Sequence, residues 1–358
     1  MHPALHTRLC DRLGIRVPVI QTAMGWVATP ELVAASCNAG AMGFLATATI
    51  PPDQVDGAIA QVKRLTDRPF GVNFLMEAPG AAKTAEAILR HRVAAASYGR
   101  GPRKDFIQRF KDAGVLCIPT VGAPRHAEKA VELGADVIVA QGAEGGGHTG
   151  SVPTSLLLPQ VLDRVRVPVV AAGGFYDGRG LAAALAFGAD GIAMGTRFLL
   201  TAESPVPDAT LDRYFAASVD DIRVTTEVDG LPQRVILNAL VRRLEAGSAA
   251  ARLVRALRSA LAYRSLTGAS LPTLLRSGLA LRRSEKLTRT QMLMAANAPI
   301  LIRRAMVEGH PDEGVLPSGQ VAGLLRDRPT VKDLIDHIVT EASERLAALE
   351  KQGGSSCS

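Results

Sequence analysis

The sequence predicts a (β/α)8 barrel, the TIM-barrel class, with a helical insertion after the eighth strand. Eight short β-type runs alternate with helical stretches between residue 17 and about residue 195, a repeat that is typical of a parallel barrel. The glycine-rich turns follow the sixth, seventh and eighth runs, and barrels of this class bind phosphate after strands seven and eight. A doubly wound open sheet is the competing fold, but it needs fewer strands and places its glycine-rich turn after the first one.

The expected strands and helices follow one another at regular places. Ala, Val and Leu dominate the apolar residues, which suits helices packed on a buried sheet. Gly40, Gly134 and Gly188 each follow an expected helix, where a left-handed residue commonly ends one. We expect strands at residues 17–21, 41–45, 70–75, 92–97, 115–121, 136–141, 167–172 and 191–194. We expect helices between them at residues 30–38, 54–65, 81–90, 127–133 and 180–187.

The pattern changes after residue 200, where the barrel repeat ends. From Gln233 to Val307 apolar residues recur at helical spacing, with arginines between them. We therefore expect a barrel domain, a mostly helical, arginine-rich insertion that caps it, a return to the barrel and a disordered tail. Their boundaries are residues 1–220, 221–314, 315–350 and 351–358, respectively.

Two closing helices are expected in the return segment, at residues 321–325 and 331–349. Thr330 is placed to cap the second helix at its N-terminus. Glu341 and Arg345 form a pair at the helical i,i+4 spacing, which supports the same helix.

Composition disfavours several classes of protein. No apolar run is long enough to cross a bilayer, so we expect no membrane span. The N-terminus lacks the charged and apolar segments of a secretory signal. The four cysteines, which form no CxxC motif, favour free thiols in a reducing cytoplasm over disulfides or a zinc site. They are Cys10, Cys37, Cys117 and Cys357. We therefore expect a cytoplasmic protein without a metal site.

Positive charge is concentrated between Asn238 and Arg304. This segment contains 13 Arg or Lys residues and two acidic ones, within a net charge of +7 for the whole chain. One interpretation is an arginine-rich helical surface that keeps the protein soluble; the other is a face that attracts an anionic substrate or partner. Nucleic-acid binding is disfavoured, because Tyr263 is the segment's only aromatic residue and no nucleic-acid-binding motif is present.

Two successive strand ends have the composition of an anion site. The apolar run that ends at Ala172 breaks at Gly173 and Gly174 and restarts as a helix, so free N–H groups meet the positive end of that helix. One strand later, Gly195 and Thr196 repeat this design. The alternative is that both are ordinary strand-to-helix turns. Two donor-rich turns in neighbouring units, however, favour binding of a phosphate monoester such as the tail of FMN.

A third glycine-rich turn carries a histidine. The sixth expected strand ends at Gln141, and five glycines, Gly146 among them, surround His148 between residues 141 and 150. A flexible surface loop is one interpretation, and a backbone lying against a flat or charged ligand is the other. Since histidine changes charge near neutral pH, His148 is placed as the base that deprotonates a carbon acid, whose anion then reduces the flavin. Glu144, in the same turn, could orient the loop or be solvated, and we expect it to be solvated.

Two further strand ends face the same edge of the expected barrel. Asn73 ends the third strand and could bond the edge of a flavin ring or cap the next loop. Thr22, Ala23 and Met24 end the first strand, where their backbone could pass along the ring. Met24 could pack on the ring, or be an ordinary core residue.

The order of these motifs resembles the nitronate monooxygenases, formerly called 2-nitropropane dioxygenases, which are FMN-dependent (β/α)8-barrel enzymes. The resemblance extends over residues 14–200 and more loosely over 318–325. The matching stretches are PVIQTAM, AASCNAGAMGFL, FGVN, VAQGAEGGGH, AAGG and MGTRF, at residues 18–24, 34–45, 70–73, 139–148, 171–174 and 194–198. The resemblance implies that His148 is the catalytic base. It implies that FMN is held by Thr22, Ala23, Met24, Asn73, Gln141, Gly146, Ala172, Gly173, Gly174, Gly195 and Thr196.

The resemblance also implies a reaction, in which a nitronate or nitroalkane and O2 give a carbonyl compound and nitrite without NAD(P)H. Two features depart from the family: its first motif usually reads Gln-Ala-Pro-Met where this chain has Gln-Thr-Ala-Met, and the basic segment is longer than the cap a small nitroalkane needs. A cationic cap suits an acyl-CoA or acyl carrier protein. The alternative is therefore an FMN-dependent NAD(P)H reductase of an enoyl thioester or a quinone. A non-enzymatic barrel that senses a phosphorylated ligand or docks an anionic protein is the third hypothesis, and a homodimer is compatible with each.

Overall fold

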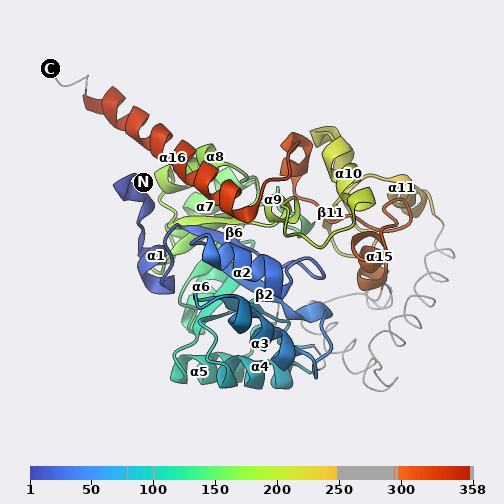
Figure 1. Cartoon of the computed structure of the whole chain (residues 1–358), viewed down its shortest axis with the longest axis horizontal. Coiled ribbons are helices and arrows are strands. Elements are labelled where there is room, and N and C mark those ends of the chain that lie inside the picture. The colour runs from blue at the N-terminus through green and yellow to red at the C-terminus, as the bar shows by residue number, and fades with distance from the viewer. Residues whose placement is uncertain (79, 100, 248–293, 295–296, 355–358) are drawn as a thin grey trace.

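The chain forms a closed parallel barrel of eight strands (Figure 1), which confirms the predicted fold. The computed structural model describes residues 1–78, 80–99, 101–247, 294 and 297–354. Consecutive strands pair in parallel, and β9 closes the barrel onto β1. The barrel strands are β1 Val19–Gln21, β2 Met42–Ala46, β3 Gly71–Asn73, β4 Ala95–Tyr98, β5 Leu116–Val121, β6 Ile138–Gln141, β8 Val169–Ala172 and β9 Gly191–Met194.

A helix follows most of these strands and covers the outside of the barrel, as the sequence predicts. The helices are α2 Pro30–Asn38, α3 Val55–Leu65, α4 Ala81–Arg90, α5 Lys104–Asp112, α6 Pro124–Glu132, α7 Thr154–Leu162 and α8 Gly178–Ala186. After β9 there is only the short helix α9, Thr196–Leu199. The long C-terminal helix α16, Val331–Gly354, packs against α8 and α2 and so fills the last position of the ring (Figure 1).

The amino ends of the strands are closed by a short helix that precedes the barrel. In α1, Arg8–Leu13, apolar side chains join the barrel's interior cluster, where Leu9 is fully buried beside residues such as Ile20 and Val170. Arg8 Nε lies 2.9 Å from Asp190 Oδ1, directly before β9. Since this end is filled, a ligand can reach the barrel only from the carboxyl ends of the strands, where such enzymes keep their sites.

The closing segment differs from its prediction in three details. The first expected helix is a 3-10 helix, Gln320–Leu324. Thr330 caps α16 as expected, because its Oγ1 accepts from the Asp333 N–H at 3.1 Å. The expected Glu341–Arg345 pair is wrong: the Glu341 carboxylate accepts from the Gly178 N–H at 2.8 Å instead, because α8 packs directly against it. Helix α16 also continues to Gly354, through the first half of the expected disordered tail, whose remainder lies outside the described residues.

The segment after the barrel is not helical throughout. Strands β10, Ile222–Thr225, and β11, Gln233–Ile236, form an antiparallel pair. The helical prediction is therefore wrong at its beginning, because β11 has pairing partners on both sides that sequence periodicity cannot reveal. Helices α10 Asp208–Ala216, α11 Ala239–Glu245 and α15 Asn297–Met306 are present. Much of the basic segment, residues 248–293 and 295–296, lies outside the described part of the chain.

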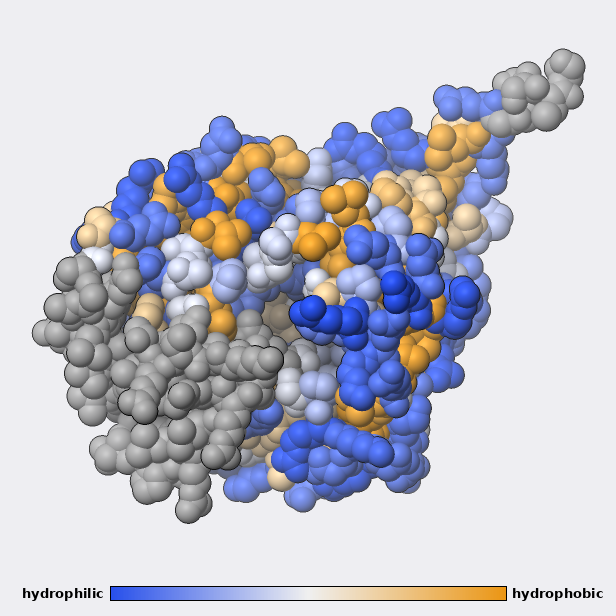
Figure 2. All heavy atoms as spheres, turned by 180° about the vertical axis from the view of Figure 1, so that it is seen from behind, coloured by the Kyte–Doolittle hydropathy of each residue, from blue (hydrophilic) through white to orange (hydrophobic). Residues whose placement is uncertain are grey.

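The surface shown in Figure 2 is largely hydrophilic, with apolar residues in small separate groups. No helix within the described ranges is long and apolar enough to cross a membrane.

Because α8 packs closely on α16, we predict that a side chain added at Gly178 lowers the stability of the protein. A Cβ at Gly178 would lie 2.5 Å from both Ala342 N and Ile338 O, so Gly178→Ala forces the helices apart and should lower the free energy of unfolding by about 1–3 kcal/mol. Gly57→Ala in α3 is the matched control, since nothing lies within 4 Å of its new methyl group. It should stabilise the protein by about 0.5–1 kcal/mol. Urea unfolding of both variants checks this, and equal effects would contradict the packing argument.

Candidate active site

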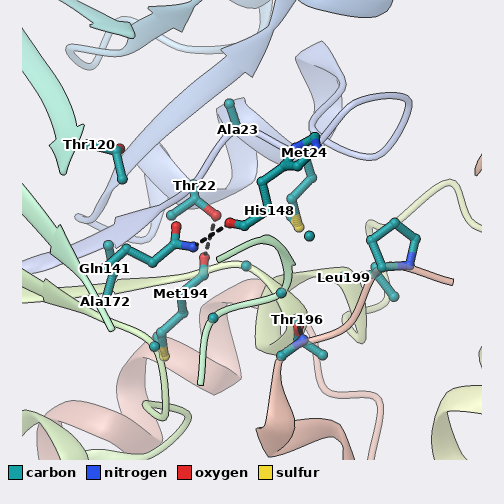
Figure 3. Close-up of a pocket in the computed structure, with 18 of the residues that line it drawn as sticks. Thr22, Ala23, Met24, Thr120, Gln141, His148, Ala172, Met194, Thr196 and Leu199 are labelled. Atoms are coloured by element: carbon teal, nitrogen blue, oxygen red, sulfur yellow. Dashed lines mark hydrogen bonds between the residues drawn. The ribbon is translucent and has the colours of Figure 1, made fainter. Parts of the chain in front are cut away.

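The residues predicted for the site all line one cavity at the carboxyl ends of the strands (Figure 3). Its volume is about 420 Å³, within the range of small-molecule sites. The predicted residues in its wall are Thr22, Ala23, Met24, Asn73, Gln141, Gly146, His148, Ala172, Gly173, Gly174, Gly195 and Thr196. The structure therefore brings them together from the carboxyl ends of five strands, β1, β3, β6, β8 and β9.

The turn after β8 needs glycine for its backbone shape. Gly173 and Gly174 have φ angles of 93° and 88°, which side chains with a Cβ rarely adopt. A Cβ on Gly173 would also lie 3.1 Å from Thr154 Oγ1. In the described part of the chain, no hydrogen bond engages the N–H groups of Gly174 and Phe175. These donors precede helix α8 and form a cradle for an anion.

In the neighbouring turn after β9, the backbone of Gly195 lies close to the loop after β1. A Cβ on Gly195 would lie 3.0 Å from Thr22 Oγ1 and 3.4 Å from Met24 Sδ, so the β1 loop packs on bare backbone here. The Thr196 hydroxyl accepts from the Gly319 N–H at 2.8 Å. It thus ties the returning segment to the cavity wall.

The loop after β6 packs tightly against that returning segment. A Cβ on Gly146 would lie 2.5 Å from Gly319 N. The backbones of the two segments are therefore in direct contact, and only glycine fits at this position. Glu144 was expected to be solvated, but it is hydrogen-bonded within the protein. Its carboxylate accepts from the Thr154 N–H at 3.0 Å and from Thr154 Oγ1 at 2.8 Å. It satisfies the N-terminus of α7, whose preceding Pro153 offers no side-chain cap.

Two amide side chains organise the polar part of the cavity. Asn73 Nδ2 donates to Ser97 Oγ at 2.7 Å, which leaves its Oδ1 as an acceptor toward a ligand. Gln141 Nε2 donates to the His148 carbonyl at 3.0 Å (Figure 3). Gln141 therefore acts on the histidine loop, in addition to lining the cavity.

His148 is held on a short strand, not on a flexible loop. Strand β7, Gly147–His148, pairs antiparallel with β11, with His148 opposite Gln233 and Gly147 opposite Arg234. The Arg234 side chain adds a bond from its Nε to the Ala143 carbonyl at 3.0 Å. Burial of this guanidinium lowers the pKa of Arg234. The insertion therefore fixes the loop that carries the histidine.

A buried carboxylate orients the imidazole. His148 Nε2 lies 2.8 Å from Asp229 Oδ2, and Asp229 is 5% exposed, whereas the His148 side chain is 40% exposed. A carboxylate can only accept, so it favours the neutral tautomer with its proton on Nε2. Nδ1 is then the nitrogen that can take a proton. Gln233 Nε2, 3.2 Å from the same ring nitrogen, is the other polar neighbour.

Sequence reasoning missed Asp229, Gln233 and Trp26, all of which lie in or beside the cavity. Asp229 is 81 positions from His148 in a segment without clear periodicity, so no local signal identifies it. Gln233 was assigned to a helix. Trp26 lies two residues after Met24 and could have been found as an aromatic residue close to a strand end.

Other reactive groups do not join the site. Cys10, Cys37 and Cys117 are free and buried, and Cys357 lies outside the described residues. Burial raises the pKa of the Cys37 and Cys117 thiols to about 12, so both stay protonated at neutral pH. Within the described residues, no group of three or more His, Cys, Asp or Glu side chains is arranged to hold a metal ion.

The cavity fits a phosphorylated ring cofactor. The backbone N–H groups after β8 and the turn at Gly195 after β9 suit a phosphate. Asn73 and Met24 line the same cavity, where the amide oxygen and the sulfur could contact a flat polar ring. A cavity of this kind with one oriented imidazole would suit a flavin-dependent oxidoreductase.

Comparison with known proteins agrees with this class. The nitronate monooxygenase family model matches residues 6–96 and 81–341, and the chain belongs to that family. A Rhodococcus jostii protein named (3aS,4S,5R,7aS)-5-hydroxy-7a-methyl-1-oxo-octahydro-1H-indene-4-carboxyl-CoA dehydrogenase is 51% identical, over 96% of this chain and 98% of its own length. A Staphylococcus saprophyticus protein named probable nitronate monooxygenase is 30% identical, over 67% of this chain and 81% of its own length. FabK from Thermotoga maritima superimposes with a TM-score of 0.79 at 31% identity, covering 97% of this chain and 99% of that one.

The Asp229 contact predicts the protonation site of the imidazole. In protein with 15N-labelled histidine, neutral His148 should carry its proton on Nε2, and Asp229→Leu should give a mixture of tautomers because the acceptor is gone. Asp56→Leu is the control, since Asp56 lies 3.0 Å from the ring of His91 and should change the signals of His91 alone. A single Nε2–H tautomer of His148 in Asp229→Leu would show that the carboxylate does not set it.

Proposed function

We propose that this protein is an FMN-dependent dehydrogenase of a CoA thioester, in which His148 is the base that removes the proton next to the thioester carbonyl. The observation that carries the proposal is the oriented imidazole of His148 on the wall of the glycine-lined cavity. The identity of the substrate class is supported by the R. jostii relative, because it matches nearly the whole chain, insertion included.

The base is suited to a carbon acid. A proton next to a thioester carbonyl is weakly acidic, so its removal needs a positioned group that works near neutral pH. Asp229 keeps the proton of His148 on Nε2 and stabilises the imidazolium that forms when Nδ1 takes the substrate proton. When bound, FMN would supply the acceptor for the hydride that leaves the neighbouring carbon.

The cofactor would be held by the residues that the sequence predicted. The N–H groups of Gly174 and Phe175 and the turn at Gly195 would receive its phosphate. Asn73 Oδ1 would accept from the edge of the ring, and Met24 would pack on it.

The described part of the basic segment supports an anionic substrate. Arg242 and Arg243 on α11 are exposed, whereas Arg303 and Arg304 on α15, the helix that lines the cavity, pair with Glu308 and Glu313. CoA carries several phosphate charges, and cationic side chains near a cavity raise the local concentration of such a ligand. A cytoplasmic location is consistent with this substrate.

Oxidation of a nitronate or nitroalkane by O2 is the second candidate, favoured by the family model and by the S. saprophyticus relative. The two reactions share deprotonation of a carbon acid by His148. The thioester is preferred, because the nitronate-named relative covers only 67% of this chain. Reduction of an enoyl thioester with NAD(P)H would run the same chemistry in the opposite direction.

Anaerobic mixing of the yellow protein with candidate substrates tests the proposal. Octahydroindene-4-carboxyl-CoA should bleach the flavin, and NADH should not. His148→Gln should keep the flavin spectrum and lose about 10²–10⁴-fold in the rate of bleaching by the thioester, the range expected for a general base. Ethyl nitronate, which is already deprotonated, serves as the control. The rate at which it bleaches the flavin should change little in His148→Gln. Bleaching by NADH but not by the thioester would contradict the direction of the reaction.

The phosphate assignment predicts loss of cofactor from one glycine variant. Gly174→Val should yield protein with little bound flavin, measured as the flavin absorbance per protein after purification. Gly188→Val is matched for strain, since Gly188 has a φ of 95° and its Cβ, like that of Gly174, would make only ordinary contacts. It lies at the end of α8, outside the cavity lining, and should retain the flavin. Equal flavin content in both variants would place the phosphate elsewhere.

A further inference from the structure

Strand β7 has one unpaired edge, and the strand lies at the cavity. It is the last strand in the three-stranded sheet β10–β11–β7, so β11 pairs with one of its edges and the other is free. Both residues of the strand, Gly147 and His148, line the cavity. Unpaired N–H and C=O groups at a strand edge are ready to bond to another molecule. The free edge of β7 therefore adds main-chain groups to the imidazole as possible contacts of a ligand.

The pairing register shows which groups of His148 lie on this free edge. His148 is opposite Gln233, and the next N–H, that of Thr149, donates to the Pro232 carbonyl at 3.3 Å. Residues in an antiparallel pair alternate between hydrogen-bonded and non-hydrogen-bonded positions. Because Thr149 bonds across to the β11 side, His148 occupies a non-hydrogen-bonded position. Its N–H and its carbonyl therefore both point away from β11.

Of these two groups, the carbonyl is bonded and the N–H is not. The His148 carbonyl accepts from Gln141 Nε2 at 3.0 Å (Figure 3), which anchors the free edge to the end of β6. Among the described residues, no acceptor engages the His148 N–H. A donor that is fixed in place and still unbonded can stabilise a negatively charged oxygen. Here that donor belongs to the same residue as the proposed base.

The proposed reaction creates a negative oxygen that needs such a donor. When Nδ1 of His148 takes the proton next to the thioester carbonyl, the electron pair of the broken C–H bond moves into the carbonyl group and gives an enolate. The pair then forms the carbon–carbon double bond as a hydride leaves the neighbouring carbon for FMN. The products are the unsaturated thioester and two-electron-reduced FMN. A donor already in position stabilises the enolate oxygen without rearranging.

We propose that the backbone N–H of His148 donates to the thioester oxygen, so that one residue supplies both the base and the donor to the enolate. This inference rests on the proposed function and adds a second catalytic group to it. A short run of covalent bonds joins the N–H to the ring, so their spacing is set once the side-chain rotamer is set. Asp229 holds the ring at 2.8 Å, and Gln141 holds the backbone. The acidic C–H and the carbonyl oxygen of a thioester are likewise on neighbouring carbons.

Replacing the backbone nitrogen of His148 by oxygen tests the donor. A holoprotein with imidazolyl-lactate in place of His148 keeps the imidazole and loses only the N–H. The rate at which octahydroindene-4-carboxyl-CoA bleaches its flavin should fall by about 10²–10³-fold, the range for the loss of one such donor. The flavin spectrum and the thermal stability should stay close to those of the wild type, because this N–H makes no bond to another described residue.

The same replacement at Thr149 is the matched control. The Thr149 N–H is bonded to the Pro232 carbonyl, so the α-hydroxy counterpart of threonine removes a bond of the sheet. This variant should lose thermal stability and keep most of its bleaching rate, the reverse of the result expected at His148. A bleaching rate that falls no further at His148 than at Thr149 would overturn the assignment of the donor.

The amide signal of residue 148 gives a readout that does not depend on turnover. His148→Gln removes the base and keeps the backbone N–H. In this 15N-labelled holoprotein, octahydroindene-4-carboxyl-CoA should move the amide proton signal of residue 148 downfield, because a hydrogen bond forms to the thioester oxygen. The matching thioether of CoA, with CH2 in place of the carbonyl, should leave that signal nearly unchanged. Equal shifts with both compounds would overturn the donor.

These measurements separate the donor from the proposed function. A wild-type flavin that the thioester fails to bleach would contradict the proposed function. A flavin that the thioester bleaches, together with an amide signal of residue 148 that does not respond to it, would overturn the donor alone.

Discussion

The pairing of β7 with β11 is the interaction on which the site depends. A loop with five glycines between residues 141 and 150 would otherwise hold no single shape, because glycine loses the most conformational freedom on ordering. The antiparallel pairing of His148 with Gln233 and of Gly147 with Arg234 fixes one side of that loop. Gln141 fixes the other side through the His148 carbonyl. The segment after the barrel is thus a structural part of the site.

Burial of Asp229 follows from the same arrangement. A carboxylate that is 5% exposed is costly unless its oxygens are bonded. Here Oδ2 meets the imidazole of His148 at 2.8 Å and Oδ1 accepts from the Leu231 N–H at 3.1 Å. The contact satisfies the buried charge and at the same time fixes the tautomer of the histidine. One interaction therefore serves both folding and the proposed chemistry.

Much of the barrel could be predicted from sequence, because its strands are continuous apolar runs and its turns need glycines such as Gly173 and Gly174. The cavity residues at strand ends followed from the same logic, since parallel strands of a barrel present their carboxyl ends together. The remaining features depend on contacts between distant segments. Strand β7 has only two residues, β11 is a strand because it has partners on both sides, and Asp229 and the acceptor role of Glu144 are set by tertiary packing.

The central claim is that an oriented histidine removes a proton from carbon, and an isotope effect tests it most directly. The rate of anaerobic flavin reduction should be measured with octahydroindene-4-carboxyl-CoA that carries deuterium or hydrogen on the carbon next to the thioester carbonyl. A reduction rate clearly slower with deuterium is predicted, because breaking that bond is part of the step that reduces the flavin. Equal reduction rates in wild type, at substrate concentrations where binding is complete, would contradict the assignment of His148 as a kinetically significant base.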